Sequence, residues 1–238
     1  PRDRGLRAGH RLDGDGEHAV GVAARHADAG AAHVDADPDA ERPWLASLYI
    51  PGPTLSAAVA QFGRLPSASV RILAVGLGRA LREIHRAGLV HRDLKPANVL
   101  LAADGPRVID FGIARAADGA TALTSADALL GSPAYMSPEQ ALSHPATQAS
   151  DIYSLGAVIA LACSGTPPFT GPTVPAVLYD VIHGRPDLSR VPSEFARVVR
   201  ACLDRVPARR PDPDAVVAAS GAGGPGGQEG NPPGTTWL

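Results

Sequence analysis

Two short stretches decide the fold of this chain: His91-Arg92-Asp93-Leu94-Lys95-Pro96-Ala97-Asn98 and, 17 residues after Asp93, Asp110-Phe111-Gly112. Asp93, Asn98 and Asp110 carry short oxygen-bearing side chains beside strand-like segments. Hard divalent cations such as Mg²⁺ are held by ligands of this kind together with phosphate oxygens. Lys95 follows Asp93 by two residues and places a compact cation on the same side. A carboxylate base, metal ligands and a cation are the groups that phosphoryl transfer requires, because that chemistry depends on positioning and charge neutralisation.

The two stretches resemble the catalytic loop and the metal-binding loop of the protein kinase family, and they match at every fixed position. The resemblance implies that Asp93 orients the substrate hydroxyl and accepts its proton, and that Lys95 neutralises the γ-phosphate of ATP. It also implies that Asn98 and Asp110 hold Mg²⁺. The lysine at 95 is typical of the serine/threonine branch. The implied reaction is therefore transfer of the ATP γ-phosphate to Ser or Thr hydroxyls of protein substrates.

Later segments extend the resemblance. The segment 131–139 resembles the end of the family's activation segment, with serine at 132 in place of threonine and serine at 137 in place of alanine. By resemblance, Asp151 braces the catalytic loop, and Arg210 pairs with the Glu139 carboxylate. The activation-segment and structural residues implied in this way are Arg92, Phe111, Gly112, Thr121, Thr124, Ser125, Ser132, Glu139, Asp151 and Arg210.

Several of these residues have specific expected roles. Arg92 precedes the catalytic aspartate, where an arginine can pair with a phosphorylated activation loop. By resemblance, the packing of Phe111 is expected to set the active arrangement of the site. The Ser132 hydroxyl is expected to form hydrogen bonds with Asp93 and Lys95. The candidate phosphorylation sites are Thr121, Thr124 and Ser125.

The small lobe of the family is incomplete in this sequence. Tyr49 and Ile50 resemble the hinge that binds adenine through its backbone, but no lysine precedes Lys95, so the β3 lysine of the family is missing. The segment 14–20 is only faintly similar to a glycine-rich phosphate loop. Two accounts compete: a catalytically inactive pseudokinase that acts as a scaffold, or a sequence truncated or frame-shifted upstream of about His33. The intact catalytic residues favour the second account.

The expected fold is α+β and protein kinase-like, consisting mostly of the helical C-terminal lobe with an incomplete small β lobe. Residues 1–32 are left unassigned as a degenerate or frame-shifted part of that lobe, residues 33–219 form the kinase domain, and 220–238 form a Gly/Pro-rich disordered tail or linker. Apolar periodicity and turn residues predict helices from Thr54, over 70–84, from Asp151 to Gly165, and over 174–183, 193–203 and 214–219. Strands are predicted over 43–50, 89–91, 99–101 and 107–109.

Composition excludes several classes of protein. The net charge of -2 gives no electrostatic footprint for nucleic acid. The longest nearly uncharged helical stretch, 152–163, is shorter than the roughly 20 residues that span a bilayer. Cys163 and Cys202 are expected to be buried structural thiols. We expect a cytoplasmic protein, or the cytosolic part of a longer membrane-anchored kinase, that forms a homodimer for autophosphorylation.

One rival enzyme class shares the expected fold. Small-molecule phosphotransferases of the aminoglycoside type also carry Asp and Asn in the catalytic loop. They lack the Lys95-Pro96 pair and the segment 131–139 that docks a peptide chain, so the sequence favours a protein substrate.

Overall fold

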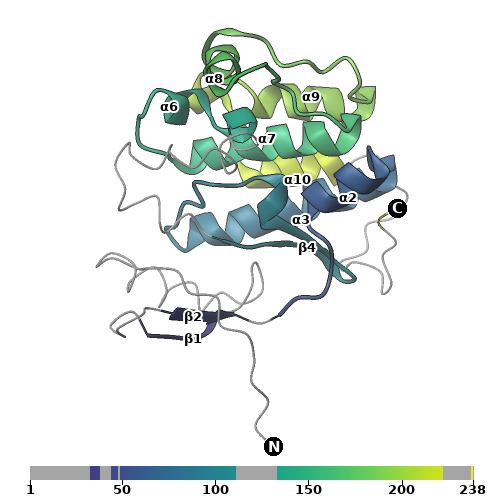
Figure 1. Cartoon of the computed structure of the whole chain (residues 1–238), viewed down its shortest axis with the longest axis vertical. Coiled ribbons are helices and arrows are strands. Elements are labelled where there is room, and N and C mark those ends of the chain that lie inside the picture. The colour runs from purple at the N-terminus through teal and green to yellow at the C-terminus, as the bar shows by residue number, and fades with distance from the viewer. Residues whose placement is uncertain (1–32, 38–43, 48, 111–132, 222–236, 238) are drawn as a thin grey trace, which may run out of the picture.

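The computed structural model describes residues 33–37, 44–47, 49–110, 133–221 and 237. Helices dominate these residues, and two antiparallel two-stranded sheets complete them, which confirms the α+β class (Figure 1). The elements in chain order are β1 (His33–Asp37), β2 (Trp44–Ser47), α2 (Leu55–Phe62), α3 (Ser67–Arg86), η1 (Pro96–Asn98), β3 (Val99–Ala102), β4 (Gly105–Val108), η2 (Pro133–Tyr135), α6 (Pro138–Ala141), α7 (Gln148–Ser164), α8 (Val174–His183), α9 (Ser193–Cys202), η3 (Pro207–Arg209) and α10 (Pro213–Gly221).

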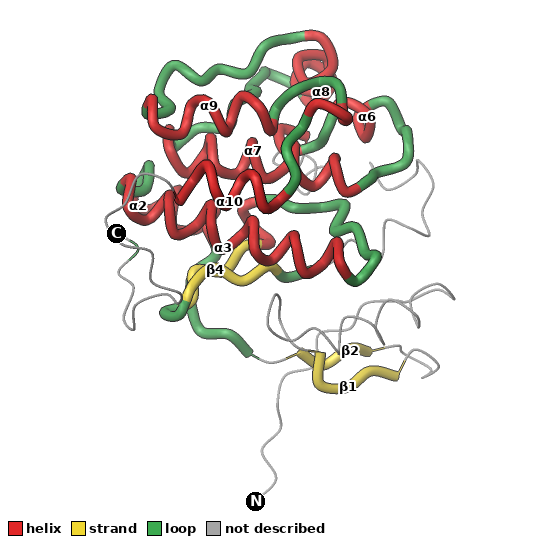
Figure 2. Tube along the Cα trace, turned by 180° about the vertical axis from the view of Figure 1, so that it is seen from behind, coloured by secondary structure: helices red, strands yellow, loops and turns green. Residues whose placement is uncertain are grey.

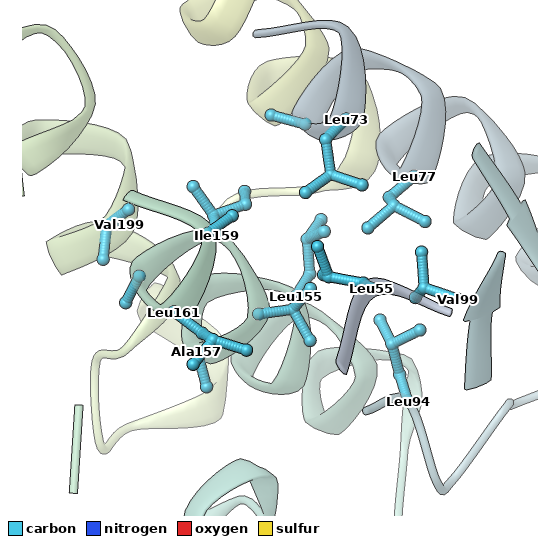
Figure 3. Close-up of a cluster of buried hydrophobic side chains, with 14 of the residues drawn as sticks. Leu55, Leu73, Leu77, Leu94, Val99, Leu155, Ala157, Ile159, Leu161 and Val199 are labelled. Atoms are coloured by element: carbon cyan, nitrogen blue, oxygen red, sulfur yellow. The ribbon is translucent and has the colours of Figure 1, made fainter. Parts of the chain in front are cut away.

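The core of the helical body lies between α3 and α7. Leu73, Leu77 and Leu81 recur every four residues along α3 and are completely buried, as an amphipathic helix requires. Helix α7 differs, because 14 of its 17 residues are buried and it is therefore enclosed on all sides. Figure 3 shows side chains of both helices meeting Leu55 of α2 and Val99 of β3 in one cluster.

Helix boundaries follow local capping chemistry. The Thr54 hydroxyl accepts a hydrogen bond from the Ala57 N–H at 3.2 Å and begins α2, as predicted. Helix α7 begins at Gln148, three residues before the predicted start at Asp151, because Thr147 and Ser150 form a capping box. It ends at Ser164, and the C-cap residue Gly165 has a φ of 80°, a left-handed conformation that glycine adopts without strain.

The strand predictions were partly wrong. Residues 89–91 form no strand, because the His91 N–H donates to the Asp151 carboxylate instead of to a neighbouring strand. The predicted strand 43–50 is reduced to β2, and Tyr49 and Ile50 lie in the link that leads to α2. Farther along, this link is tied to the hairpin of β3 and β4 by the hydrogen bond from Leu101 N to the Pro53 carbonyl (2.9 Å).

The C-terminal boundary also differs from the prediction. Helix α10 continues through Gly221, and Trp237 is 8% exposed with its indole N–H donating to the Ala102 carbonyl at 2.9 Å. Residues 220 and 221 thus belong to α10, and the rest of the predicted tail, apart from Trp237, lies outside the described part of the chain.

The hairpin of β1 and β2 lies to one side of the helical body in both views (Figures 1 and 2). No helix in the described part of the chain is long and apolar enough to cross a membrane.

Candidate active site

The predicted catalytic loop, residues 91–98, follows α3 and includes η1, and a buried carboxylate holds its backbone. Asp151 of α7 is 1% exposed, and its two oxygens accept hydrogen bonds from the N–H groups of His91 and Arg92, each at 2.9 Å. Arg92 has a φ of 69°, a left-handed conformation that costs free energy in a non-glycine residue. The Asp151 contacts offset this cost and keep the loop in one conformation.

Two histidines complete this brace. His91 is completely buried, and its Nδ1 accepts from the Asp93 N–H at 3.3 Å, so the ring proton lies on Nε2, which donates to the Ile109 carbonyl at 3.2 Å. Burial lowers the pKa of His91 and keeps the ring neutral. His85 at the end of α3 contacts Asp151 Oδ2 through its Nε2 at 2.9 Å. Sequence reasoning did not find His85, because nothing in its local pattern separates it from other polar helix residues.

Three of the predicted site residues meet directly. Lys95 Nζ lies 2.7 Å from Asp93 Oδ2. Asn98 Nδ2 donates to the Asp93 carbonyl at 2.9 Å and to Asp93 Oδ2 at 3.3 Å. The Asn98 backbone N–H also donates to the Lys95 carbonyl at 2.9 Å. The Asp93 carboxylate is therefore partly buried and oriented by both neighbours, with 17% of its side-chain surface exposed.

Asp110 follows β4 at the edge of the same site. The Ile109 N–H donates to the Asn98 carbonyl at 3.0 Å, which brings residue 110 next to Asn98. Asp110 is exposed and has a φ of 54°. A carboxylate and an amide oxygen are donors of the kind that Mg²⁺ prefers, so the chemistry of Asp110 and Asn98 is compatible with that ion. No group of three His, Cys, Asp or Glu residues in the described ranges could hold a metal ion, so water and phosphate oxygens would complete the coordination.

An ion pair joins Arg210, whose side chain is buried, to partly buried Glu139 at the start of α6. Arg210 donates to both oxygens of Glu139, at 2.6 and 2.8 Å, and the Ser150 hydroxyl donates to the same carboxylate at 2.7 Å. Burial raises the pKa of Glu139, but the hydrogen bonds from Arg210 and Ser150 outweigh it and lower the pKa to about 2. Glu139 is therefore ionised at neutral pH, and it ties the start of α6 to residues near the end of the domain.

A small pocket of about 10 Å³ lies beside the catalytic loop. The residues that line it are Arg92, Asp93, Leu94, Lys95, Tyr135, Met136, Gln140 and Ser154. The Ser154 hydroxyl donates to the Tyr135 carbonyl at 2.8 Å and thereby fixes η2 on α7. Gln140 was missed at the level of sequence, although its spacing from Ser137 is that of a capping box, S-x-x-Q, which the structure contains.

The other predicted site residues are either exposed at least in part or lie outside the described part of the chain. Tyr49 and Ile50 are described, and the Tyr49 side chain is 88% exposed. Arg92 belongs to the loop and is exposed. The remaining predicted residues lie outside the described part of the chain: Phe111, Gly112, Thr121, Thr124, Ser125 and Ser132.

Comparison with known proteins gives matches over most of the chain. Residues 34–220 match the family model described as "Protein kinase domain". The chain is 48% identical over 184 residues to the serine/threonine-protein kinase AfsK of Streptomyces coelicolor, which covers 77% of this chain and 23% of that protein. It is 46% identical over 178 residues to the probable serine/threonine-protein kinase PkwA of Thermomonospora curvata (75% and 24%). It is 38% identical over 183 residues to the serine/threonine-protein kinase PknL of Mycobacterium tuberculosis (74% and 45%). The chain thus spans less than half the length of each of these bacterial relatives.

Proposed function

The chain belongs to the protein kinase family, and from this premise we propose that it transfers the γ-phosphate of ATP to serine or threonine hydroxyls of protein substrates. The observation that carries the proposal is the arrangement around Asp93. Its carboxylate lies 2.7 Å from Lys95 and 3.3 Å from Asn98, on a loop whose backbone is braced by a buried aspartate. A base and a cation held this close suit a reaction in which a proton leaves a hydroxyl while negative charge gathers on phosphate oxygens.

Each residue has a distinct part in the proposed reaction. Asp93 orients the substrate hydroxyl and accepts its proton, and Lys95 neutralises charge on the transferred phosphoryl group. Asn98 and Asp110 would hold Mg²⁺, which offsets the charge of the phosphate oxygens when bound. The backbone of Tyr49 and Ile50 would contact adenine. Because Asn98 also donates to Asp93, the same side chain orients the base and completes the metal site.

Substrates and regulation follow from the same premise. The substrate hydroxyl would lie beside Asp93 and Lys95. Autophosphorylation in a homodimer would use hydroxyls of the activation segment, at Thr121, Thr124 or Ser125, and would place a phosphate within reach of Arg92. We assign the domain to the cytoplasm, where ATP is available. The relatives' names favour protein substrates over small-molecule acceptors.

The first experiment compares Asp93→Asn with the unchanged chain in a radiolabelled ATP assay with a generic basic protein as acceptor. Asparagine keeps the shape of the side chain and cannot accept the proton, so we expect a fall in rate of about a hundredfold or more. Asp104→Asn is the matched control, because Asp104 lies in the turn of the β3–β4 hairpin with 68% of its side chain exposed. Activity of Asp93→Asn close to that of the unchanged chain would refute the role assigned to Asp93.

A second candidate function is that of a pseudokinase scaffold. The observation that favours it is the absence of any lysine before Lys95 in this sequence. The change in melting temperature on addition of ATP and Mg²⁺, measured for the unchanged chain and for Asp110→Asn, separates the two functions. A chain that binds the nucleotide should show an increase that is lost in the variant, and a scaffold should show none. Translation of the DNA upstream of the His33 codon in all three frames tests the same point. A glycine-rich loop followed by a lysine would favour the active kinase, and its absence would favour the scaffold.

A further inference from the structure

Gln140 on α6 joins two segments that are far apart in the sequence. Its Oε1 accepts hydrogen bonds from the Ser137 N–H at 3.1 Å and from the Ser137 hydroxyl at 3.0 Å. Its Nε2 donates to the Arg92 carbonyl at 2.7 Å. Because a side-chain amide has one acceptor atom and one donor atom, the two contacts with Ser137 turn Nε2 toward the catalytic loop.

The Arg92 carbonyl belongs to the peptide group whose nitrogen is that of Asp93. The N–H of this group donates to His91 Nδ1 at 3.3 Å, and its oxygen accepts from Gln140. The preceding peptide group is held in turn by Asp151, which accepts from the Arg92 N–H at 2.9 Å. Because a peptide group is planar, contacts at its two ends set its rotation, and this rotation sets the direction in which the Asp93 side chain leaves the backbone.

We propose that Gln140 is a positioning residue for Asp93, which couples the seating of the segment 133–141 to the placement of the catalytic base. The inference rests on the proposed kinase function. Arg92 has a positive φ, which a non-glycine residue does not favour. Its backbone conformation therefore depends on the hydrogen bonds that Asp151 and Gln140 make with it. Gln140 and Asp93 also line the same pocket. A shift of α6 that breaks the 2.7 Å contact therefore releases the peptide group next to the base.

Two substitutions separate this role from simple packing. Gln140→Glu keeps the shape of the side chain and still accepts from Ser137, but it places a carboxylate oxygen against the Arg92 carbonyl. Gln140→Met keeps the length and removes both interactions. The matched control is Gln148→Glu, because Gln148 on α7 donates in the same way to a backbone carbonyl, that of His85, at 3.1 Å.

The expected kinetic result is a fall in kcat of about a hundredfold for Gln140→Glu and about tenfold for Gln140→Met, with KM for ATP unchanged, because misplacement of a reacting group costs rate and not nucleotide binding. Gln148→Glu should stay within about twofold of the unchanged protein. Unchanged kcat in both Gln140 variants would overturn the proposal. Parallel loss of kcat, ATP affinity and melting temperature would also overturn it, because that pattern indicates general destabilisation.

A second measurement does not depend on activity. The amide ¹⁵N chemical shift of Asp93 responds to hydrogen bonding at the preceding carbonyl, so both Gln140 variants should move this signal and Gln148→Glu should not. If the unchanged protein transfers no phosphate, the proposed function fails and the amide signal still decides the role of Gln140. A signal that stays in place in both Gln140 variants refutes the coupling.

Discussion

Replacement of Arg210 by methionine tests the ion pair that ties α6 to the end of the domain. The Arg210 residue is 8% exposed. Its guanidinium donates to both Glu139 oxygens at 2.6 and 2.8 Å, and to the carbonyls of Asp204 at 2.7 Å, Ala149 at 2.8 Å and Arg205 at 3.3 Å. Methionine fills a similar volume and makes none of these hydrogen bonds, so the Glu139 carboxylate loses its counter-charge.

The structure sets the size of the expected effect. Removal of one partner of a buried ion pair costs about 3–5 kcal/mol, because the remaining charge is left uncompensated. For a domain of this size, each kcal/mol corresponds to about 2–4 °C in melting temperature, so Arg210→Met should melt about 6–20 °C lower. Glu139→Gln should cost a comparable amount, because it leaves the guanidinium buried beside a neutral amide. Arg82→Met is the control, since Arg82 pairs with exposed Asp214 and should cost about 1 kcal/mol or less.

The same pair predicts a pH dependence. Burial opposes ionisation of Glu139, but Arg210 and Ser150 lower its pKa from 4.5 to about 2 in the folded state. A carboxylate whose pKa is lower in the folded state binds protons preferentially in the unfolded state, so its contribution to stability is complete above pH 4.5. This contribution is lost as the pH falls toward 2.

Urea denaturation followed by circular dichroism measures both effects. The free energy of unfolding of the unchanged chain should exceed that of Glu139→Gln by a constant amount above about pH 5, and this difference should shrink as the pH is lowered to 3. A difference that stays constant over this range, or that is below about 1 kcal/mol at pH 7, would refute the assignment of Glu139 as a buried, ionised partner.

Three further substitutions test the fold. Trp237→Phe keeps the aromatic packing and removes the donor to the Ala102 carbonyl, so it should lower the free energy of unfolding by about 1–3 kcal/mol in urea denaturation, and a cost near zero would argue against this docked position. Thr54→Ala should cost about 0.5–2 kcal/mol through loss of the α2 N-cap, with serine at the same position as the restoring variant. Leu77→Ala at a completely buried position of α3 should cost about 2–5 kcal/mol by calorimetry, and less than 1 kcal/mol would contradict its place in the core.

Much of the fold was readable from short-range patterns. The recurrence of leucine at every fourth position of α3, the Thr54 cap and the C-cap at Gly165 are consequences of contacts within a few residues, so the sequence predicts them directly. The residues around Asp93 were recognisable for a related reason. Asp93, Lys95 and Asn98 lie within six consecutive positions. Because the loop that carries them is short, their side chains can be arranged relative to one another in only a few ways.

The pairing of Arg210 with Glu139 came from the family resemblance and not from the residues themselves. Seventy-one positions separate the two, and an arginine in a charged run near the end of a domain is ordinarily a solvated side chain. The structure buries this arginine because η3 and α6 are both packed near the first turn of α7.

By itself, the sequence determined the helices, the catalytic loop and the class of chemistry, because these depend on neighbours along the chain. The tertiary structure alone decided that His85 supports Asp151, that Gln140 holds the Arg92 carbonyl and that Trp237 returns to the β3–β4 hairpin. Apolar burial drives α3 and α7 together without specifying partners, since the hydrophobic effect has no direction. Once these helices have packed, the polar side chains near the helix ends form the hydrogen bonds that the packed geometry permits. The order of residues along the chain does not specify that geometry.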